Sequence, residues 1–281
     1  MQTSVSRIFS KTGEILKTRS GPLFGLWATF FAAQIALMVG LVAVIGVSTF
    51  AGASADGSPF GFGGGMILGI IVMYLVILLI VAAQNASLTA MASPLQRISF
   101  GDALNAGVRS ALPMLGVIVL LLIGYFVCAL VAGLVFGVVA TLGKPIAVLL
   151  GLLLIPAVIY LACRLCVINA VVAVDGVGNP VTAIARGWAM TRGHVSTILG
   201  AVLLFLVGTV VLGGLLFYSY FTSMMAAATM GQPPSAGGSL LTILAFFVYS
   251  IAVSIVGAAL FAVIHGELSD TSAARTTDVF G

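Results

Sequence analysis

The segment RLCVINAVVAVDGVGNPVTAIARGWAMTRGH, residues 164–194, connects one long hydrophobic run to the next. Its second half predicts a short helix, because Asn179 is a favourable N-cap and Pro180 falls at the first helical position, where no N–H is needed. The apolar side chains that recur at helical spacing on one face are Val181, Ile184, Ala185 and Trp188. We therefore expect an amphipathic helix on a membrane surface, with that face buried in the interface, between two membrane-spanning segments.

The composition of the chain places it among integral membrane proteins. Of its 281 residues, 61% are hydrophobic and only 6% are charged, whereas soluble domains contain about 25% charged residues. The formal net charge is +4, but the 11 Lys and Arg residues are scattered along the chain, so a nucleic-acid partner is not expected. The three cysteines all fall in apolar runs, which argues against a disulfide framework.

Six apolar runs are long enough to span a bilayer, which requires about 20 residues each. Amphipathic surface helices are also expected at residues 5–20 and at 96–111, where Ser99 and Asp102 have the spacing of a capping box. The predicted fold class is all-α, a polytopic membrane bundle of six transmembrane helices with amphipathic surface helices. The predicted spans cover approximately residues 24–50, 66–91, 112–142, 146–174, 195–220 and 240–264.

Internal similarity indicates three copies of one unit, a surface helix followed by two spans. Arg7 and Pro22 in the first copy correspond to Arg97 and Pro113 in the second, with one residue of slip between the two matches. The alternative is that apolar sequence of low complexity aligns with itself without true repetition. The predicted units are residues 5–92, 96–174 and 179–268, within a single membrane domain, 1–268, that is followed by a polar tail, 269–281.

The positive-inside rule predicts the orientation of the spans. In the six-span scheme, nine of the Lys and Arg residues flank one side of the membrane, and only Lys144 lies on the other. Both termini and the polar tail are therefore predicted to be cytoplasmic. An even number of spans agrees with this orientation.

Several residues between 164 and 194 match the pattern of a known family: Arg164, Val171 to Asp175, Asn179-Pro180, Ala183, Arg186-Gly187-Trp188 and Thr191 to His194. In this segment the chain resembles the membrane domain fused to some glycerophosphoryl diester phosphodiesterases, and related stand-alone bacterial membrane proteins of unknown function. It departs from the pattern at Asp175, where Glu is common, and at Gly187, where Ser is usual. The resemblance implies six helices in the bacterial inner membrane and no site residues. The catalytic phosphodiesterase domain is absent from this sequence, so the resemblance does not imply enzyme activity.

Polar residues within or beside the spans are the candidates for function, because they are costly in a bilayer. Our hypothesis is a cytoplasm-facing polar cavity that binds an anionic lipid head group or a membrane-protein partner, with Arg164, Arg186 and Arg192 as counter-charges. The alternative is hydrogen bonding between helices, and within it Glu267 is the expected partner of Arg164. The candidate residues are Gln84, Asn85, Arg164, Asn169, Asp175, Arg186, Arg192, His265 and Glu267.

Three classes of function are compatible with this sequence. A non-catalytic multi-pass protein that binds lipid or a partner ranks first, because no set of catalytic, cofactor-binding or metal-ligating residues is predicted. A transporter or permease is the second class, and an intramembrane lipid-modifying enzyme is the third. No cofactor is expected for the first class.

Overall fold

The computed structural model describes residues 4–56, 64–229 and 236–280, and helices are the only regular elements among them. Six segments of these residues are long and apolar enough to cross a membrane, and they lie in α1, α2, α3, α4 with α5, α7 and α8. The all-α, multi-pass membrane fold is thus confirmed. The helices are α1 (Val5–Asp56), α2 (Gly64–Ala92), α3 (Phe100–Leu142), α4 (Lys144–Leu165), α5 (Ile168–Ala173), α6 (Pro180–Met190), α7 (Val195–Thr229) and α8 (Ala236–Phe280).

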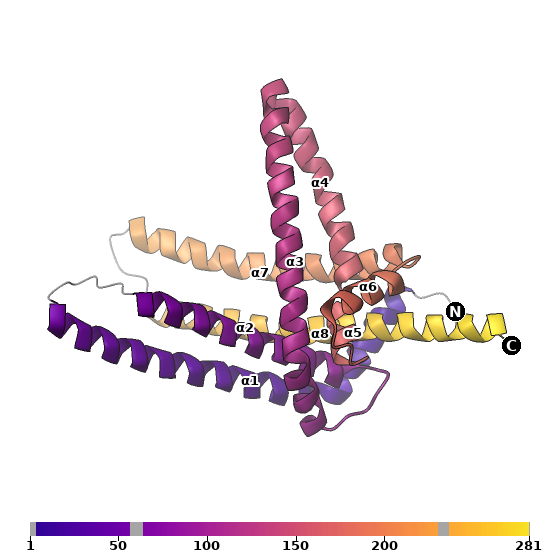
Figure 1. Ribbon diagram of the computed structural model, residues 1–281, viewed down its shortest axis with the longest axis horizontal. Coiled ribbons are helices and arrows are strands. Elements are labelled where there is room, and N and C mark those ends of the chain that lie inside the picture. Colours follow the sequence, from indigo (N-terminus) through magenta and orange to yellow (C-terminus); the bar gives the residue numbers. More distant parts are fainter. Residues whose placement is uncertain (1–3, 57–63, 230–235, 281) are drawn as a thin grey trace.

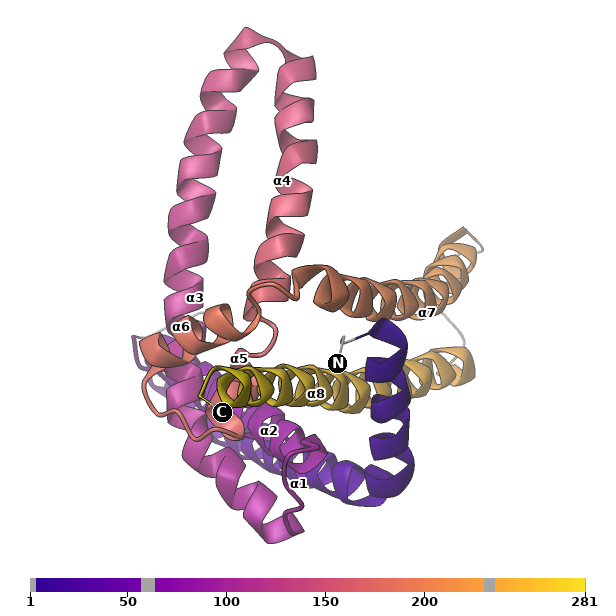
Figure 2. The ribbon, with the colours of Figure 1, turned by 90° about the vertical axis from the view of Figure 1, so that its right-hand side faces the viewer.

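The long helices form hairpins that meet at one end of the molecule. Helices α1, α2, α7 and α8 run along the long axis, and the α3–α4 hairpin rises across them (Figure 1). Helix α2 packs against α1, α3 and α8, and α7 packs against α8. The short helices α5 and α6 lie where the α3–α4 hairpin meets α2 and α8 (Figure 2).

The first two predicted surface helices are continuous with the spans that follow them. Helix α1 begins at Val5 and α3 at Phe100, and each contains a proline, Pro22 and Pro113 respectively. Proline inside a helix removes one hydrogen bond and bends the axis without necessarily ending the helix. The first, indigo part of α1 accordingly turns away from the rest of that helix (Figure 2).

Asn179 and the residues after it form the predicted short helix, α6. Asn179 caps α6 by accepting hydrogen bonds from the backbone N–H groups of Val181 and Thr182 at 2.9 and 3.4 Å. A turn at residues 191–194 separates α6 from α7, and Gly193 adopts a positive φ of 86° that favours glycine. Helix α6 is therefore the one surface helix among the described residues that is separate from the following span.

Several helix ends differ from the predictions, most of all those of α4, α7 and α8. The fourth span, predicted to continue to residue 174, is interrupted after Leu165 by a turn that precedes α5. Helix α8 continues through the predicted polar tail to Phe280, and α7 extends past residue 220 to Thr229. The pattern of apolar residues in the sequence shows where a helix is apolar but not where its backbone hydrogen bonding stops. Such differences therefore arise at helix ends. The threefold repeat stays a prediction.

The buried residues gather at the end of the molecule where the hairpins meet, which we call the core end. Its apolar core is formed by the first part of α1, the last part of α2 and residues 258–268 of α8, together with α5. Small residues let these helices approach closely, and a Cβ added at Gly107 of α3 would lie only 2.5 Å from the carbonyl oxygen of Ala83 in α2. The side chains far from the core end are mostly exposed on the protein surface, as expected for spans that face lipid.

Candidate functional site

The structure places the predicted polar residues at the core end but divides them into separate clusters. One surrounds Arg164, a second surrounds Asp175 and a third surrounds Glu267. Each cluster joins separate elements of the fold. Their contacts show which of these residues are already paired with other groups of the protein.

Arg164, at the end of α4, is 7% exposed and is held by α6. Its Nη1 donates to the carbonyl oxygen of Trp188 at 2.9 Å and to Thr191 Oγ1 at 3.3 Å. Its Nε donates to the Tyr160 hydroxyl at 3.1 Å, and its guanidinium carbon lies 4.5 Å from the centre of the Trp188 ring. The predicted ion pair with Glu267 is therefore wrong, because carbonyl, hydroxyl and aromatic groups at the end of α6 stabilise this charge instead.

Asp175 joins the loop after α5 to two other helices. Its Oδ2 lies 2.8 Å from Arg186 Nη2 on α6 and 3.3 Å from His265 Nε2 on α8. The His265 side chain is fully buried, and its Nδ1 has no hydrogen-bond partner among the described residues. Arg186 is thus paired within the protein, which weakens the hypothesis that it serves as a counter-charge for a ligand.

Glu267 of α8 pairs with two cations of α1. Its Oε1 lies 3.3 Å from Arg7 Nε and also contacts Lys11 Nζ. The Glu267 side chain is only 6% exposed, whereas those of Arg7 and Lys11 are 40% and 35% exposed. A buried carboxylate within α8 therefore holds the first part of α1 against that helix, with its cationic partners nearer the surface.

The remaining candidates stand apart from these ion pairs. Gln84 of α2 accepts a hydrogen bond from Gln34 Nε2 of α1 at 3.1 Å, which links two spans. Asn85 donates to the carbonyl oxygen of Val81 within α2 at 2.9 Å. Asn169 lies half-buried on α5, and Arg192 is exposed after α6. The hydrogen bonds of Gln84 and Asn85 fit the structural alternative, in which polar groups in spans bond to one another or to the backbone.

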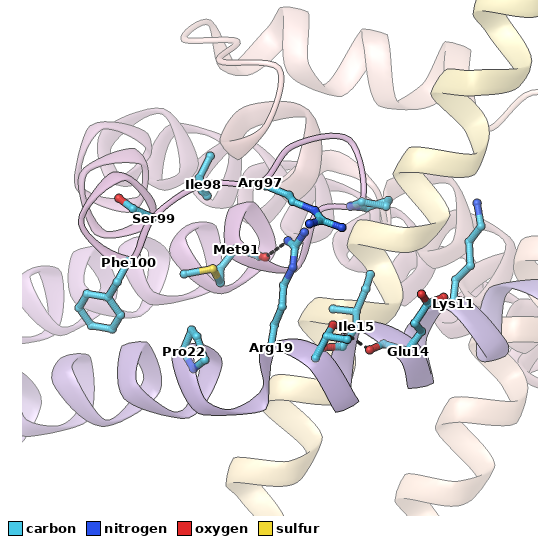
Figure 3. A pocket seen from close by; sticks show the side chains of 12 residues that line it. Lys11, Glu14, Ile15, Arg19, Pro22, Met91, Arg97, Ile98, Ser99 and Phe100 are labelled. Atoms are coloured by element: carbon cyan, nitrogen blue, oxygen red, sulfur yellow. Dashed lines mark hydrogen bonds between the residues drawn. The ribbon is translucent and has the colours of Figure 1, made fainter.

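A basic groove of about 660 Å³ lies beside these clusters, between the first part of α1, the end of α2 and the beginning of α3. Arg19 and Arg97 point into the same part of it (Figure 3). Lys11 is the third cation in the groove, and Glu14 is the only acid among the lining residues. The lining residues are Lys11, Glu14, Ile15, Thr18, Arg19, Pro22, Met91, Pro94, Arg97, Ile98, Ser99 and Phe100.

Arg19 is fixed in the groove by the end of α2. Its Nη1 donates to the carbonyl oxygens of Met91, Ser93 and Gln96 at 2.6, 3.1 and 3.4 Å. These oxygens belong to the last turn of α2 and to the connection that follows it, where carbonyl groups lack helical partners. Arg19 thereby positions the connection that carries Arg97.

Arg97 is the most available cation of the groove. It is exposed, and it makes no ion pair with any acid that the structure describes. Ser99, the N-cap of α3, accepts a hydrogen bond from the Asp102 backbone N–H at 3.2 Å, which fixes the end of the same connection. Three cations and one carboxylate therefore line the groove, and although Lys11 also contacts Glu267, this charge balance favours an anion.

The groove has an apolar part as well as a basic one. Pro22, Met91 and Phe100 line it at a distance from Lys11, and Figure 3 shows them apart from that residue. Basic and apolar surface in one groove suits a ligand that is both anionic and apolar.

No family model, curated protein or solved structure matches this chain. The resemblance of residues 164–194 to the phosphodiesterase-linked membrane domain therefore stays a prediction.

The groove was not predicted from the sequence, in which Lys11, Arg19 and Arg97 are three of the nine basic residues that indicate the orientation of the spans. One feature of the sequence does relate two of the segments that line the groove: Arg7 and Arg97 occupy corresponding positions in two of the predicted repeats. Nothing in that match indicates that the first part of α1 and the connection after α2 lie against each other.

Proposed function

We propose that this multi-pass membrane protein binds a phosphate-bearing, anionic lipid head group in the basic groove, without catalysing a reaction on it. The observation that supports this proposal is the convergence of Lys11, Arg19 and Arg97 on one groove that contains a single acid, Glu14. Arg is suited to phosphate because its planar N–H donors match phosphate oxygens, and Lys adds a point charge.

The position of the groove favours a lipid over a soluble anion. It lies along the first part of α1 and beside the beginning of α3, two of the three segments whose sequences predict amphipathic surface helices. The side chain of Phe100 is 40% exposed, so apolar surface is available beside the cations. A lipid whose phosphate binds the arginines and whose chain lies along Phe100 and Pro22 uses both parts of the groove.

We place the groove in the cytoplasmic leaflet of a bacterial inner membrane, where anionic lipids attract basic segments. The positive-inside rule supports this side, and the resemblance of residues 164–194 supports the kind of membrane. The protein then has cytoplasmic termini and six spans. A membrane-protein partner remains a second candidate ligand of the same surface.

The orientation predicts the outcome of reporter fusions. A reporter that is active only in the cytoplasm is expected to be active after Gly281 and inactive when inserted at Gly143, between α3 and α4. Activity of the Gly143 fusion, with an inactive fusion after Gly281, would reverse the topology. The groove would then lie in the other leaflet.

The binding proposal predicts that Arg97→Gln weakens anionic lipid binding at least tenfold, because a charged hydrogen bond to phosphate contributes about 1.5–3 kcal/mol. The protein is reconstituted in phosphatidylcholine nanodiscs and titrated with short-chain phosphatidylglycerol, and bound lipid is counted by native mass spectrometry. Inorganic phosphate forms a second arm, which separates a lipid site from a general phosphate site.

Arg109→Gln is the matched control for this experiment. Arg109 is an exposed arginine of α3 that does not line the groove, so its loss removes the same charge at a different place. Equal weakening in the two variants means that only net charge matters, and the groove is then not the site. Retention of phosphatidylglycerol by Arg97→Gln at the level of the unmodified protein contradicts the proposal directly.

A further inference from the structure

Lys11 takes part in both the basic groove and the ion pairs of Glu267. Its side chain lines the basic groove, and its Nζ contacts the Oε1 of Glu267 on α8. Arg7, one turn earlier on α1, contacts the same oxygen at 3.3 Å but does not line the groove. The groove is therefore connected to Glu267 of α8 through one shared cation.

Glu267 depends on this connection because its carboxylate is nearly inaccessible. Its side chain is 6% exposed, and a charged group that is removed from water must be balanced by nearby cations or donors. Lys11 is 35% exposed and has a long, flexible side chain, so its ammonium group can move toward the groove at little conformational cost. An anion in the groove thus competes with Glu267 for the same ammonium group.

We propose that binding of an anionic head group in the groove draws Lys11 from Glu267 and thereby loosens the contact between α1 and α8 at Glu267. This inference rests on the proposed function, since it requires an anion in the groove. By thermodynamic reciprocity, whatever strengthens the Lys11–Glu267 pair weakens ligand binding, and a change that frees Lys11 from Glu267 strengthens ligand binding. Ligand binding in the groove thereby changes the packing of α8 against α1.

The other charged groups near Glu267 are paired with one another, so the loosening is expected only where α8 contacts α1. Two residues before Glu267, His265 faces Asp175, and Asp175 is held by Arg186 of α6 at 2.8 Å. None of these three residues lines the groove, so an anion there leaves their contacts in place. The expected effect is a local loosening along α1 and α8, with the α5–α6 side of α8 unchanged.

Two substitutions in the same ion-pair cluster have opposite expected effects on affinity. Glu267→Gln removes the competitor for Lys11, so phosphatidylglycerol binding is expected to tighten about fivefold, at the lower end of typical coupling between sites. Arg7→Gln removes the other cation from Glu267, which then holds Lys11 more strongly, so binding is expected to weaken about threefold. A purely structural role for the cluster predicts weaker binding in both variants.

The titration uses the full chain in phosphatidylcholine nanodiscs, with short-chain phosphatidylglycerol as the probe. Hydrogen–deuterium exchange of residues 258–269 is measured with and without this lipid, and it is expected to rise on binding. Exchange of residues 168–190, which cover α5 and α6, is the internal control and is expected to stay constant. If Glu267→Gln does not fold, the direction of the Arg7→Gln effect and the exchange of the unmodified protein decide the question.

The outcomes for the two proposals are separable. Loss of binding in Arg97→Gln together with unchanged affinity in Glu267→Gln and Arg7→Gln supports the lipid site and overturns the coupling to α8. Retained binding in Arg97→Gln overturns the site itself. Weakened binding in both cluster variants, with no change in the exchange of residues 258–269, also overturns the coupling.

Discussion

Replacement of Gly107 with alanine is expected to lower the free energy of unfolding by about 2–3 kcal/mol, within the range of overpacking in a protein core. Gly107 lies where α3 packs closely on α2. An added Cβ would lie 1.8 Å from Ser87 Oγ and 2.5 Å from the carbonyl oxygen of Ala83, and the second atom belongs to the backbone. The Ser87 side chain can rotate, but the Ala83 carbonyl can move only with α2 itself, so the helices must separate.

Gly124→Ala is the matched control, because Gly124 lies on the same helix and a Cβ there meets no atom within 4 Å. Alanine has the higher helix propensity by about 1 kcal/mol, so this variant is expected to be neutral or slightly more stable. Both variants are compared by thermal and denaturant unfolding in the same detergent. Equal stability of Gly107→Ala and the unmodified protein would show that α2 and α3 do not approach this closely.

Arg164→Leu is expected to lower the free energy of unfolding by about 2 kcal/mol and to release α6 from α4. The substitution removes hydrogen bonds from a charged donor to Trp188 and Thr191 and the stacking of the guanidinium on the Trp188 ring. The loss is partly offset because a buried charge is also removed. Hydrogen–deuterium exchange of residues 180–190 is expected to increase together with the loss of stability.

A double-mutant cycle tests whether Arg164 and Glu267 act independently. The effects of Arg164→Leu and Glu267→Gln are expected to add within about 0.5 kcal/mol, because the two side chains have different partners. Partial rescue of Arg164→Leu by Glu267→Gln would mean that the acid is stranded in the single variant. That result would restore the ion pair that the sequence predicted and contradict the contacts described above.

The class and the local elements of this protein were predictable from the sequence because they depend on short-range properties. The chain consists mainly of long apolar runs and has only 6% charged residues, which is compatible with a membrane. Within lipid a helix forms the hydrogen bonds of its own backbone N–H and carbonyl groups, so these runs are helical. The helix caps at Asn179 and Ser99 were predictable for a related reason, since each side chain bonds to N–H groups two or three residues away.

The division of the chain into separate helices was less predictable near proline residues. The sequence predicts separate surface helices before Pro22 and Pro113, yet α1 and α3 continue through both residues. Proline disfavours a helix interior by about 3 kcal/mol, but packing at the core end outweighs this preference. The first part of α1 contributes Ile8, Ile15 and Leu23 to the buried core.

The partners of the charged residues, and with them the groove, were decided only by the tertiary structure. The sequence indicates that Arg164 needs a partner, but every residue has a carbonyl group, so no pattern distinguishes the one at Trp188. Likewise, Arg19 and Arg97 form one groove only because the end of α2 brings the connection after it against α1. A charge interacts with whatever lies within a few ångströms in space, and separation along the chain does not determine that distance.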